Sequence, residues 1–175
     1  MFAGKTEELL RRVRRAVIGG RAVQVFAHAL DTRQGSGVVA SHAGREHPSR
    51  EVGSADEILG LVLEETDIVA IDEAHFFGPE LVPVVEELAH RGLVVVVAGL
   101  DVTFAGRPFE PLPSLMAVAE RVDKLTAICA ICGEEAVFHQ RIEAVSAVDT
   151  DLVVEHVGGS EKYEARCRRH FAPVA

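Results

Sequence analysis

The sequence has no apolar run long enough to cross a membrane, because the longest run, residues 93–100, has the length of a buried strand. It is also poor in basic residues, with 18 Lys and Arg against 27 Asp and Glu and a net charge of −9. Broad, non-specific binding of nucleic acid requires many cations that neutralise phosphates. We therefore expect neither a membrane protein nor a general nucleic-acid binder.

Cysteines are few: the 175 residues contain three. Two of them form a Cys-x-x-Cys pair, and such a set suits a metal site in a reducing compartment better than a disulfide framework. We therefore expect a cytoplasmic protein. The alternative interpretation is that the cysteines are merely buried apolar side chains.

The same cysteines carry a motif with metal-ligand spacing. Cys129-x-x-Cys132 is followed by Cys167-x-x-His170, which offers three thiolates and one imidazole. Four such ligands form a closed tetrahedral zinc site, and its type is structural because no position remains for water. Such a site would stabilise a segment too small to support its own core.

Apolar periodicity predicts an α/β fold. Apolar residues recur at helical spacing in 6–18 and 79–91, and Ser54 with Glu57 forms a capping box that opens a helix at 54–65. Three strands are predicted from apolar stretches: residues 22–30, 67–71 and 93–98. Strands that alternate with helices form an open parallel sheet, and the continuous run at 93–98 is typical of a strand covered on both faces.

The remaining segments are predicted to be loops and a second domain. Residues 31–53 are rich in Gly, Ser, His and Arg and are interpreted as a loop that contains a short strand at 37–41. Short β-like stretches replace the α/β pattern after about Asp123. We therefore expect a nucleotide-binding core over residues 1–123 and a small zinc-binding domain over 124–175.

A phosphate-binding motif stands at the start of the sequence. Gly4, Lys5 and Thr6 match the second half of G-x-x-x-x-G-K-[ST], and a predicted helix follows at once. In this motif backbone N–H groups surround the phosphates, the Lys reaches the β- and γ-phosphates, and the Thr hydroxyl ligates Mg²⁺. We expect ATP and Mg²⁺ to bind here.

An acidic pair follows the predicted strand at 67–71. Asp72 stands where a P-loop fold places a carboxylate that organises Mg²⁺. Glu73 is placed to act as a general base that takes a proton from a hydroxyl or from water. The alternative is two solvated acids at a strand end, but the Gly-Lys-Thr motif favours the functional interpretation.

Together these motifs resemble the type II thymidine kinases, which have a P-loop core of the RecA type and a zinc-bound lasso domain. The resemblance spans nearly the whole chain. It rests on residues 1–6, 31–33, 41–44, 71–77, 100–109 and 157–163 and on the two zinc-binding pairs. It implies a RecA-like parallel sheet with helices on both faces, and transfer of the ATP γ-phosphoryl group to thymidine or deoxyuridine.

The resemblance also assigns roles to individual residues. It implies that Glu73 accepts the proton of the nucleoside 5′-hydroxyl, and that Thr6 and Asp72 hold Mg²⁺. The ATP-binding residues it implies are Gly4, Lys5, Thr6, Asp31, Arg33, Asp72 and His75. The substrate-binding residues it implies are Phe76, Leu100, Phe104, Phe109, Val154, His156, Val157, Gly158 and Tyr163. A homotetramer is implied as well.

The chain departs from the family pattern at three places. The family's first strand and first loop glycine have no counterpart in residues 1–3, so we expect the chain as given to be impaired. His75 stands where the family usually has Gln, and His139 stands where it often has a pocket Thr. Both histidines bear on base selectivity.

Two other functions compete with this one. A P-loop ATPase, of motor or regulatory type, would hydrolyse ATP without regard to thymidine. A non-catalytic zinc-ribbon module would bind nucleic acid or protein and would have no affinity for nucleotides, although the acidic balance of the chain argues against it.

Overall fold

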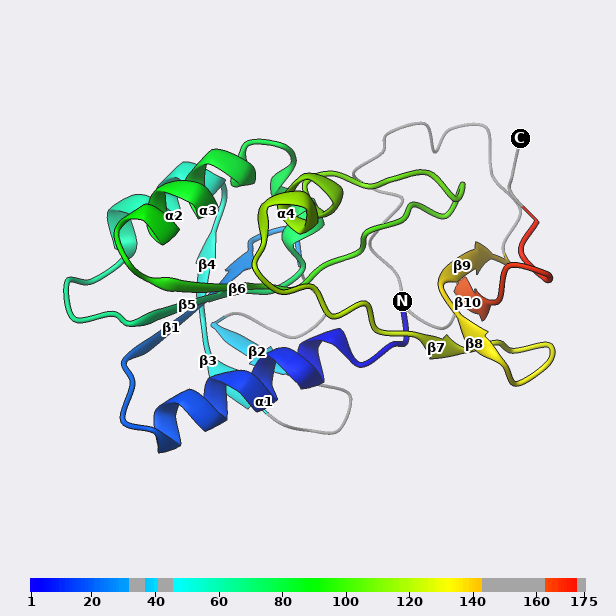
Figure 1. Ribbon diagram of the computed structural model, residues 1–175, viewed down its shortest axis with the longest axis horizontal. Coiled ribbons are helices and arrows are strands. Elements are labelled where there is room, and N and C mark those ends of the chain that lie inside the picture. Colours follow the sequence, from blue (N-terminus) through cyan, green and yellow to red (C-terminus); the bar gives the residue numbers. More distant parts are fainter. Residues whose placement is uncertain (32–36, 41–45, 143–162, 173–175) are drawn as a thin grey trace. The chain divides into compact units, whose positions relative to one another are not determined.

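The computed structural model describes residues 1–31, 37–40, 46–142 and 163–172, and it divides into two compact units (Figure 1). The core unit contains residues 5–101 and 110–121. The cysteine unit contains residues 1–4, 102–109 and those from 122 onward. Each unit has its own sheet structure, so each is described by itself.

The core unit is built on a parallel sheet of four strands in the order β4-β1-β5-β6. The bounds are β1 Val23–His28, β4 Arg50–Val52, β5 Ile68–Ile71 and β6 Val94–Val97. In the central pair, Val25 of β1 lies beside Ala70 of β5. A separate antiparallel ribbon joins β2, Val38–Ala40, to β3, Glu46–Pro48. The strand predicted at 37–41 is thus present.

Helices cover both faces of this sheet (Figure 1). Helix α1, Lys5–Ile18, packs Leu9, Leu10 and Val13 against one face. Helices α2, Ala55–Leu61, and α3, Leu81–His90, cover the other face, where Phe26 and Ile71 are buried. Successive strand residues point to opposite faces, which places these residues in separate clusters. The predicted α/β P-loop fold is therefore confirmed.

A glycine follows the last turn of α1. Gly20 has a φ of +75°, the left-handed conformation that favours glycine, and its N–H donates to the Val17 carbonyl at 3.0 Å. The chain then turns directly into β1. This short turn sets α1 antiparallel to β1 and brings the first residues of α1 to the carboxyl edge of the sheet.

Three details of the core unit differ from the sequence predictions. Residues 50–52, predicted to be loop, form β4, because this polar segment pairs with β1 in a parallel register. Helix α2 ends at Leu61 instead of residue 65, since Val62 is already extended. Ser54 is the N-cap of α2, but its hydroxyl bonds to the Glu57 carboxylate at 3.2 Å and makes no backbone capping bond.

Strand β6 lies at an edge of the described sheet, beside β5. It is predicted to be covered on both faces, and this is confirmed in part, because Val95 and Val97 pack against the core cluster on one face and Val96 packs against the cluster on the other. Val94, the first residue of the strand, is 49% exposed. Two helical segments are absent from the sequence predictions: the 3₁₀ helix η2, Ala74–Phe77, and helix α4, Leu112–Val118.

The cysteine unit contains two small antiparallel ribbons. Strand β7, Ala127–Ile128, pairs with β8, Glu135–Ala136, and β9, Phe138–Arg141, pairs with β10, Tyr163–Arg166. Its core is small and includes Cys129, which is buried with alanines from three of the strands. So small an apolar core predicts that the unit needs additional stabilisation. None of the helices in the described part of the chain is long and apolar enough to cross a bilayer.

Candidate functional site

The acidic pair lies at the carboxyl edge of the sheet, directly after β5. The Asp72 and Glu73 side chains are buried, with Asp72 3% and Glu73 6% exposed. In open α/β sheets this edge is where ligands bind. Two carboxyl groups buried side by side in the protein interior are costly to ionise, so their presence points to a functional role.

The first turn of α1 meets this acidic pair. The Thr6 hydroxyl donates to Asp72 Oδ2 at 2.9 Å, and the Glu73 backbone N–H donates to Asp72 Oδ1 at 3.0 Å. Burial and the neighbouring charge of Glu73 raise the pKa of Asp72, while the two donors and the charge of Lys5 act in the opposite direction. Lys5, Thr6 and the acidic pair therefore lie together in one region of the core unit.

Glu73 has an unusual backbone. Its φ of +45° and ψ of 44° place it in the left-handed region, which a residue with a long side chain rarely adopts. This conformation turns the chain sharply between β5 and η2. Strained backbone of this kind is concentrated at functional sites, because the surrounding structure must hold it in place.

His75 lies between Glu73 and the chain beyond β6. Its Nδ1 lies 3.4 Å from Glu73 Oε2, and the Leu100 backbone N–H donates to the same Nδ1 at 3.3 Å. The His75 ring also stacks obliquely on Phe76, with 4.4 Å between the ring centroids. The imidazole thus lies between the carboxylate of Glu73 and the backbone at Leu100, and it limits how the carboxylate can move.

His28 shows no metal-ligand spacing in the sequence and is interpreted there as an ordinary histidine, but it belongs to the same edge of the sheet. It is the last residue of β1, it is buried, and its Nδ1 accepts a hydrogen bond from the Leu30 N–H at 3.1 Å. Its ring meets the Phe77 ring edge to face, with 4.6 Å between the ring centroids, and burial lowers its pKa. The signal in the sequence is its place at the end of a strand whose neighbour, β5, is followed directly by Asp72.

The four metal-ligand residues converge in the cysteine unit. The ligand atoms of Cys129, Cys132, Cys167 and His170 all lie within 4.8 Å of one another. Cys132 Sγ is 3.8 Å from Cys167 Sγ, which is too far for a disulfide. His170 Nδ1 is 3.4 Å from Cys167 Sγ and 3.8 Å from Cys129 Sγ.

These distances fit a zinc ion. Bond lengths of about 2.3 Å to sulfur and about 2.0 Å to nitrogen place tetrahedral ligands roughly 3.5–3.8 Å apart. Burial alone would raise the pKa of the Cys129 thiol, but backbone N–H groups of Cys167, Ile131 and Cys132 and the His170 side chain lower it to about 5. A thiol that ionises so readily is suited to binding metal. All four positions are filled by protein, so the site is structural in type.

The other predicted residues are divided between the two units. Asp31 follows β1, and its N–H donates to the His28 carbonyl at 2.9 Å. The core unit contains Lys5, Thr6, Asp31, Asp72, Glu73, His75, Phe76 and Leu100. The cysteine unit contains Gly4, Phe104, Phe109 and Tyr163. Arg33, Val154, His156, Val157 and Gly158 lie outside the described residues.

Tyr163 and His139 face each other across the second ribbon of the cysteine unit. Both side chains are 2% exposed, and their rings meet edge to face at 5.5 Å. The burial of Tyr163 holds its ring in place. No pattern in the sequence indicates the contact with His139.

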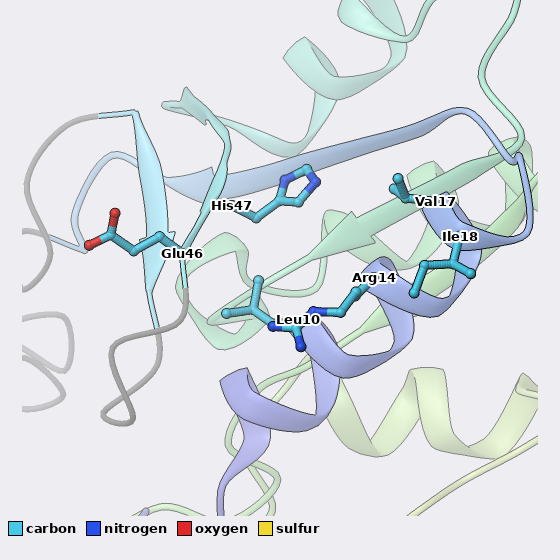
Figure 2. Close-up of a pocket in the computed structure, with 6 residues that line it drawn as sticks. All are labelled: Leu10, Arg14, Val17, Ile18, Glu46 and His47. Atoms are coloured by element: carbon cyan, nitrogen blue, oxygen red, sulfur yellow. The ribbon is translucent and has the colours of Figure 1, made fainter.

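A hollow elsewhere in the core unit lies apart from this chemistry. It runs between α1 and β3, and its lining is partly apolar and partly charged (Figure 2). The lining residues are Leu10, Arg14, Val17, Ile18, Glu46 and His47. None of the predicted catalytic, nucleotide-binding or metal-binding residues lines it.

Comparison with known protein families agrees with this arrangement. The family described as thymidine kinase matches residues 1–171 of the 175. The cluster of three cysteines and one histidine supports its zinc-containing, type II form. The match spans the acidic edge of the core unit and the cysteine cluster alike, and we conclude that the chain belongs to the thymidine kinase family.

Proposed function

We propose that the protein is a deoxynucleoside kinase that transfers the γ-phosphoryl group of ATP to the 5′-hydroxyl of thymidine, in pyrimidine salvage. The observation that carries the proposal is the bond between Thr6 and Asp72, 66 positions apart in the sequence. This bond joins the start of α1 to the acidic end of β5, as a shared site for phosphates and their cation requires. Membership of the thymidine kinase family supports the choice of acceptor.

The phosphate side of the site consists of Lys5, Thr6 and Asp72. Lys5 and the first N–H groups of α1 are suited to phosphate oxygens, because a helix N-terminus and an ammonium group both attract anions. Hydroxyl and carboxylate oxygens are the ligands that Mg²⁺ prefers, so Thr6 and Asp72 fit this ion. When bound, Mg²⁺ supplies charge neutralisation for the triphosphate. Asp31, His75, Gly4 and Arg33 complete the ATP-binding set in this proposal.

Glu73 is the proton acceptor in the proposed reaction. The nucleoside 5′-oxygen forms a bond to the γ-phosphorus as the bond from that phosphorus to the β,γ-bridging oxygen breaks. The hydroxyl proton passes to the carboxylate of Glu73. His75 limits the rotation of this carboxylate through the contact at 3.4 Å.

Recognition of the nucleoside is assigned by the family resemblance. Phe76 and Leu100 of the core unit and Phe104, Phe109 and Tyr163 of the cysteine unit would contact thymidine or deoxyuridine. Val154, His156, Val157 and Gly158 would contribute from the lasso. We also propose a cytoplasmic homotetramer, which the family resemblance supports.

The test is phosphoryl transfer from ATP to thymidine by the parent and by Glu73→Gln. General bases contribute about 10²–10⁴-fold, so we expect kcat to fall by about that factor in the variant. Glu51→Gln, which changes an exposed residue of β4, is the matched control and should leave kcat unchanged. Equal transfer by the parent and Glu73→Gln would rule out this base.

The competing functions are separated by two further measurements. A P-loop ATPase would release ADP at the same rate with and without thymidine, whereas a thymidine kinase requires the nucleoside. A zinc-ribbon module would bind oligonucleotides in a salt-sensitive manner and would not bind ATP. Lys5→Met should weaken ATP binding, and a variant with full affinity and turnover would contradict the assigned phosphate site.

A further inference from the structure

A short closed loop in the cysteine unit carries two of the residues assigned to nucleoside recognition. Val102 and Pro108 form an antiparallel bridge that closes it. Within the loop, the Thr103 N–H donates to the Arg107 carbonyl at 2.8 Å, and the Gly106 N–H donates to the Thr103 carbonyl at 2.9 Å. These bonds fix the internal shape of the loop but not its position in the unit.

Gly106 is the point where the loop meets the rest of the unit. It has a φ of +76°, and a Cβ atom at this position would lie 2.7 Å from Cε1 and 3.2 Å from Cζ of Phe171. No real Cβ atom tolerates a contact of 2.7 Å, so the loop approaches the ring as closely as glycine alone permits. The Phe171 ring therefore packs directly against the backbone of the loop.

The Phe171 ring has little freedom to yield. It stacks on Phe138 of β9 with 4.4 Å between centroids and 13° between planes. The Arg168 guanidinium lies 5.0 Å from the centre of the same Phe138 ring. Beyond the ring, the Ala172 N–H donates to Gln140 Oε1 at 3.0 Å, which ties the chain to β9.

Phe171 also follows His170, the last of the four residues in the cysteine cluster. The chain is thus held at His170 on one side of Phe171 and at Ala172 on the other. With the stacking on Phe138, three constraints act on one aromatic residue, and the loop backbone at Gly106 packs against its ring. These contacts fix the position of the loop relative to the metal-ligand cluster.

We propose that Phe171 is a positioning residue for nucleoside binding. Its contact with Gly106 holds the loop of residues 102–109 in place and so orders Phe104 and Phe109. The proposal rests on the proposed thymidine kinase function. It gives the cysteine unit a second role, because the unit then stabilises its own chain and also sets the position of a loop that lies some 60 residues earlier in the sequence. Phe171 itself need not touch the substrate.

The test compares Phe171→Ala and Gly106→Ala with Gly20→Ala. Gly20 has nearly the same φ, +75°, but a Cβ there would meet nothing within 4 Å. Gly20→Ala therefore reproduces the backbone strain without the contact. We expect the two loop variants to raise the thymidine KM about tenfold or more, because misplacing binding groups by about 1 Å has large effects. The ATP KM should change by less than about twofold, and the control should change neither.

Two further measurements isolate the contact itself. Hydrogen exchange at the Thr103 and Gly106 amides should accelerate in Phe171→Ala, while the bound zinc content stays equal to that of the parent. In the double variant Gly106→Ala/Phe171→Ala the added methyl group gains room, so the thymidine KM should be no worse than in either single variant. Phe171→Leu should recover part of the loss.

Several outcomes would overturn the proposal. The first is a thymidine KM that is unchanged in Phe171→Ala and Gly106→Ala, and the second is a rise of the ATP KM in parallel with the thymidine KM. The others are a double variant in which the effects of the two single variants simply add, and loss of zinc from Phe171→Ala. A parent protein that does not phosphorylate thymidine would instead refute the proposed function. In that case the hydrogen exchange of the 102–109 loop still decides whether Phe171 holds this loop in place.

Discussion

Replacing Asp72 by Asn should make the metal-free protein more stable while abolishing its chemistry. The Asp72 carboxyl group is buried, and burial with the adjacent charge of Glu73 raises its pKa from 3.8 to about 7. An Asn side chain has nearly the same shape and carries no charge. Its amide can donate to the Thr6 hydroxyl, which then accepts where it donated before, and its oxygen can still accept from the Glu73 N–H.

The magnitude follows from linkage between protonation and folding. A carboxyl group whose folded-state pKa is raised contributes stability that is full below the unfolded pKa and is lost as pH rises to the folded pKa. Each pKa unit corresponds to about 1.4 kcal/mol, so a rise of about three units corresponds to about 4 kcal/mol. We expect the free energy of unfolding of Asp72→Asn to exceed that of the parent by less than about 1 kcal/mol at pH 4 and by about 4 kcal/mol at pH 8.

The assay is urea unfolding of both proteins between pH 4 and pH 8 in buffer without magnesium. Asp56→Asn is the matched control, because Asp56 is an exposed aspartate in the first turn of α2. Its effect should stay below about 1 kcal/mol at every pH. Adding Mg²⁺ at pH 8 should stabilise the parent and leave Asp72→Asn unaffected. If the difference between parent and Asp72→Asn does not grow with pH, the buried charge is not the cause.

Three other perturbations test packing, hydrogen bonding and metal dependence. Gly99→Ala should destabilise the core unit by about 1–3 kcal/mol, because its Cβ would lie 2.7 Å from Leu112 Cδ2. The control is Gly60→Ala, which has open space around it and should not lower the thermal stability at all. His75→Ala should destabilise the folded protein by about 1–3 kcal/mol, because the buried Leu100 N–H loses its acceptor, whereas His75→Gln should lower the free energy of unfolding by less than about 1 kcal/mol. Equal effects of the two variants would refute the hydrogen bond from Leu100 to His75. A zinc chelator should accelerate hydrogen exchange in the cysteine unit and leave β1 and β5 protected; uniform acceleration would contradict a local structural role.

The core elements that depend on their own apolar pattern could be predicted from the sequence. Helix α1 and strands β1, β5 and β6 lie within a few residues of their predicted bounds, because each carries enough periodic apolar side chains to reveal its buried face. Strand β4 has no such pattern. It is a strand because β1 offers it a parallel partner, and this tertiary cause leaves no trace in three largely polar residues.

Helix α4 escapes sequence prediction for a related reason. It is short, with Pro111 as its N-cap and Pro113 in its first turn, which hides its periodicity, and its buried Leu112 packs closely against Gly99. In the candidate site, local motifs and the rule for strand ends predict that Lys5 lies near Asp72 and that the three cysteines gather with His170, and the structure places them so. The left-handed backbone of Glu73 and the contact of Phe171 with Gly106 arise from packing between distant segments, so no local pattern predicts them.

The left-handed backbone of Glu73 has a consequence for engineering. Gly and Asn adopt this conformation more easily than Glu does. A library screened for heat resistance alone would therefore enrich these residues at position 73, and its most durable members would lack the carboxylate. Selection for thermostability in this protein should be paired with a turnover screen, or position 73 should be kept out of the library.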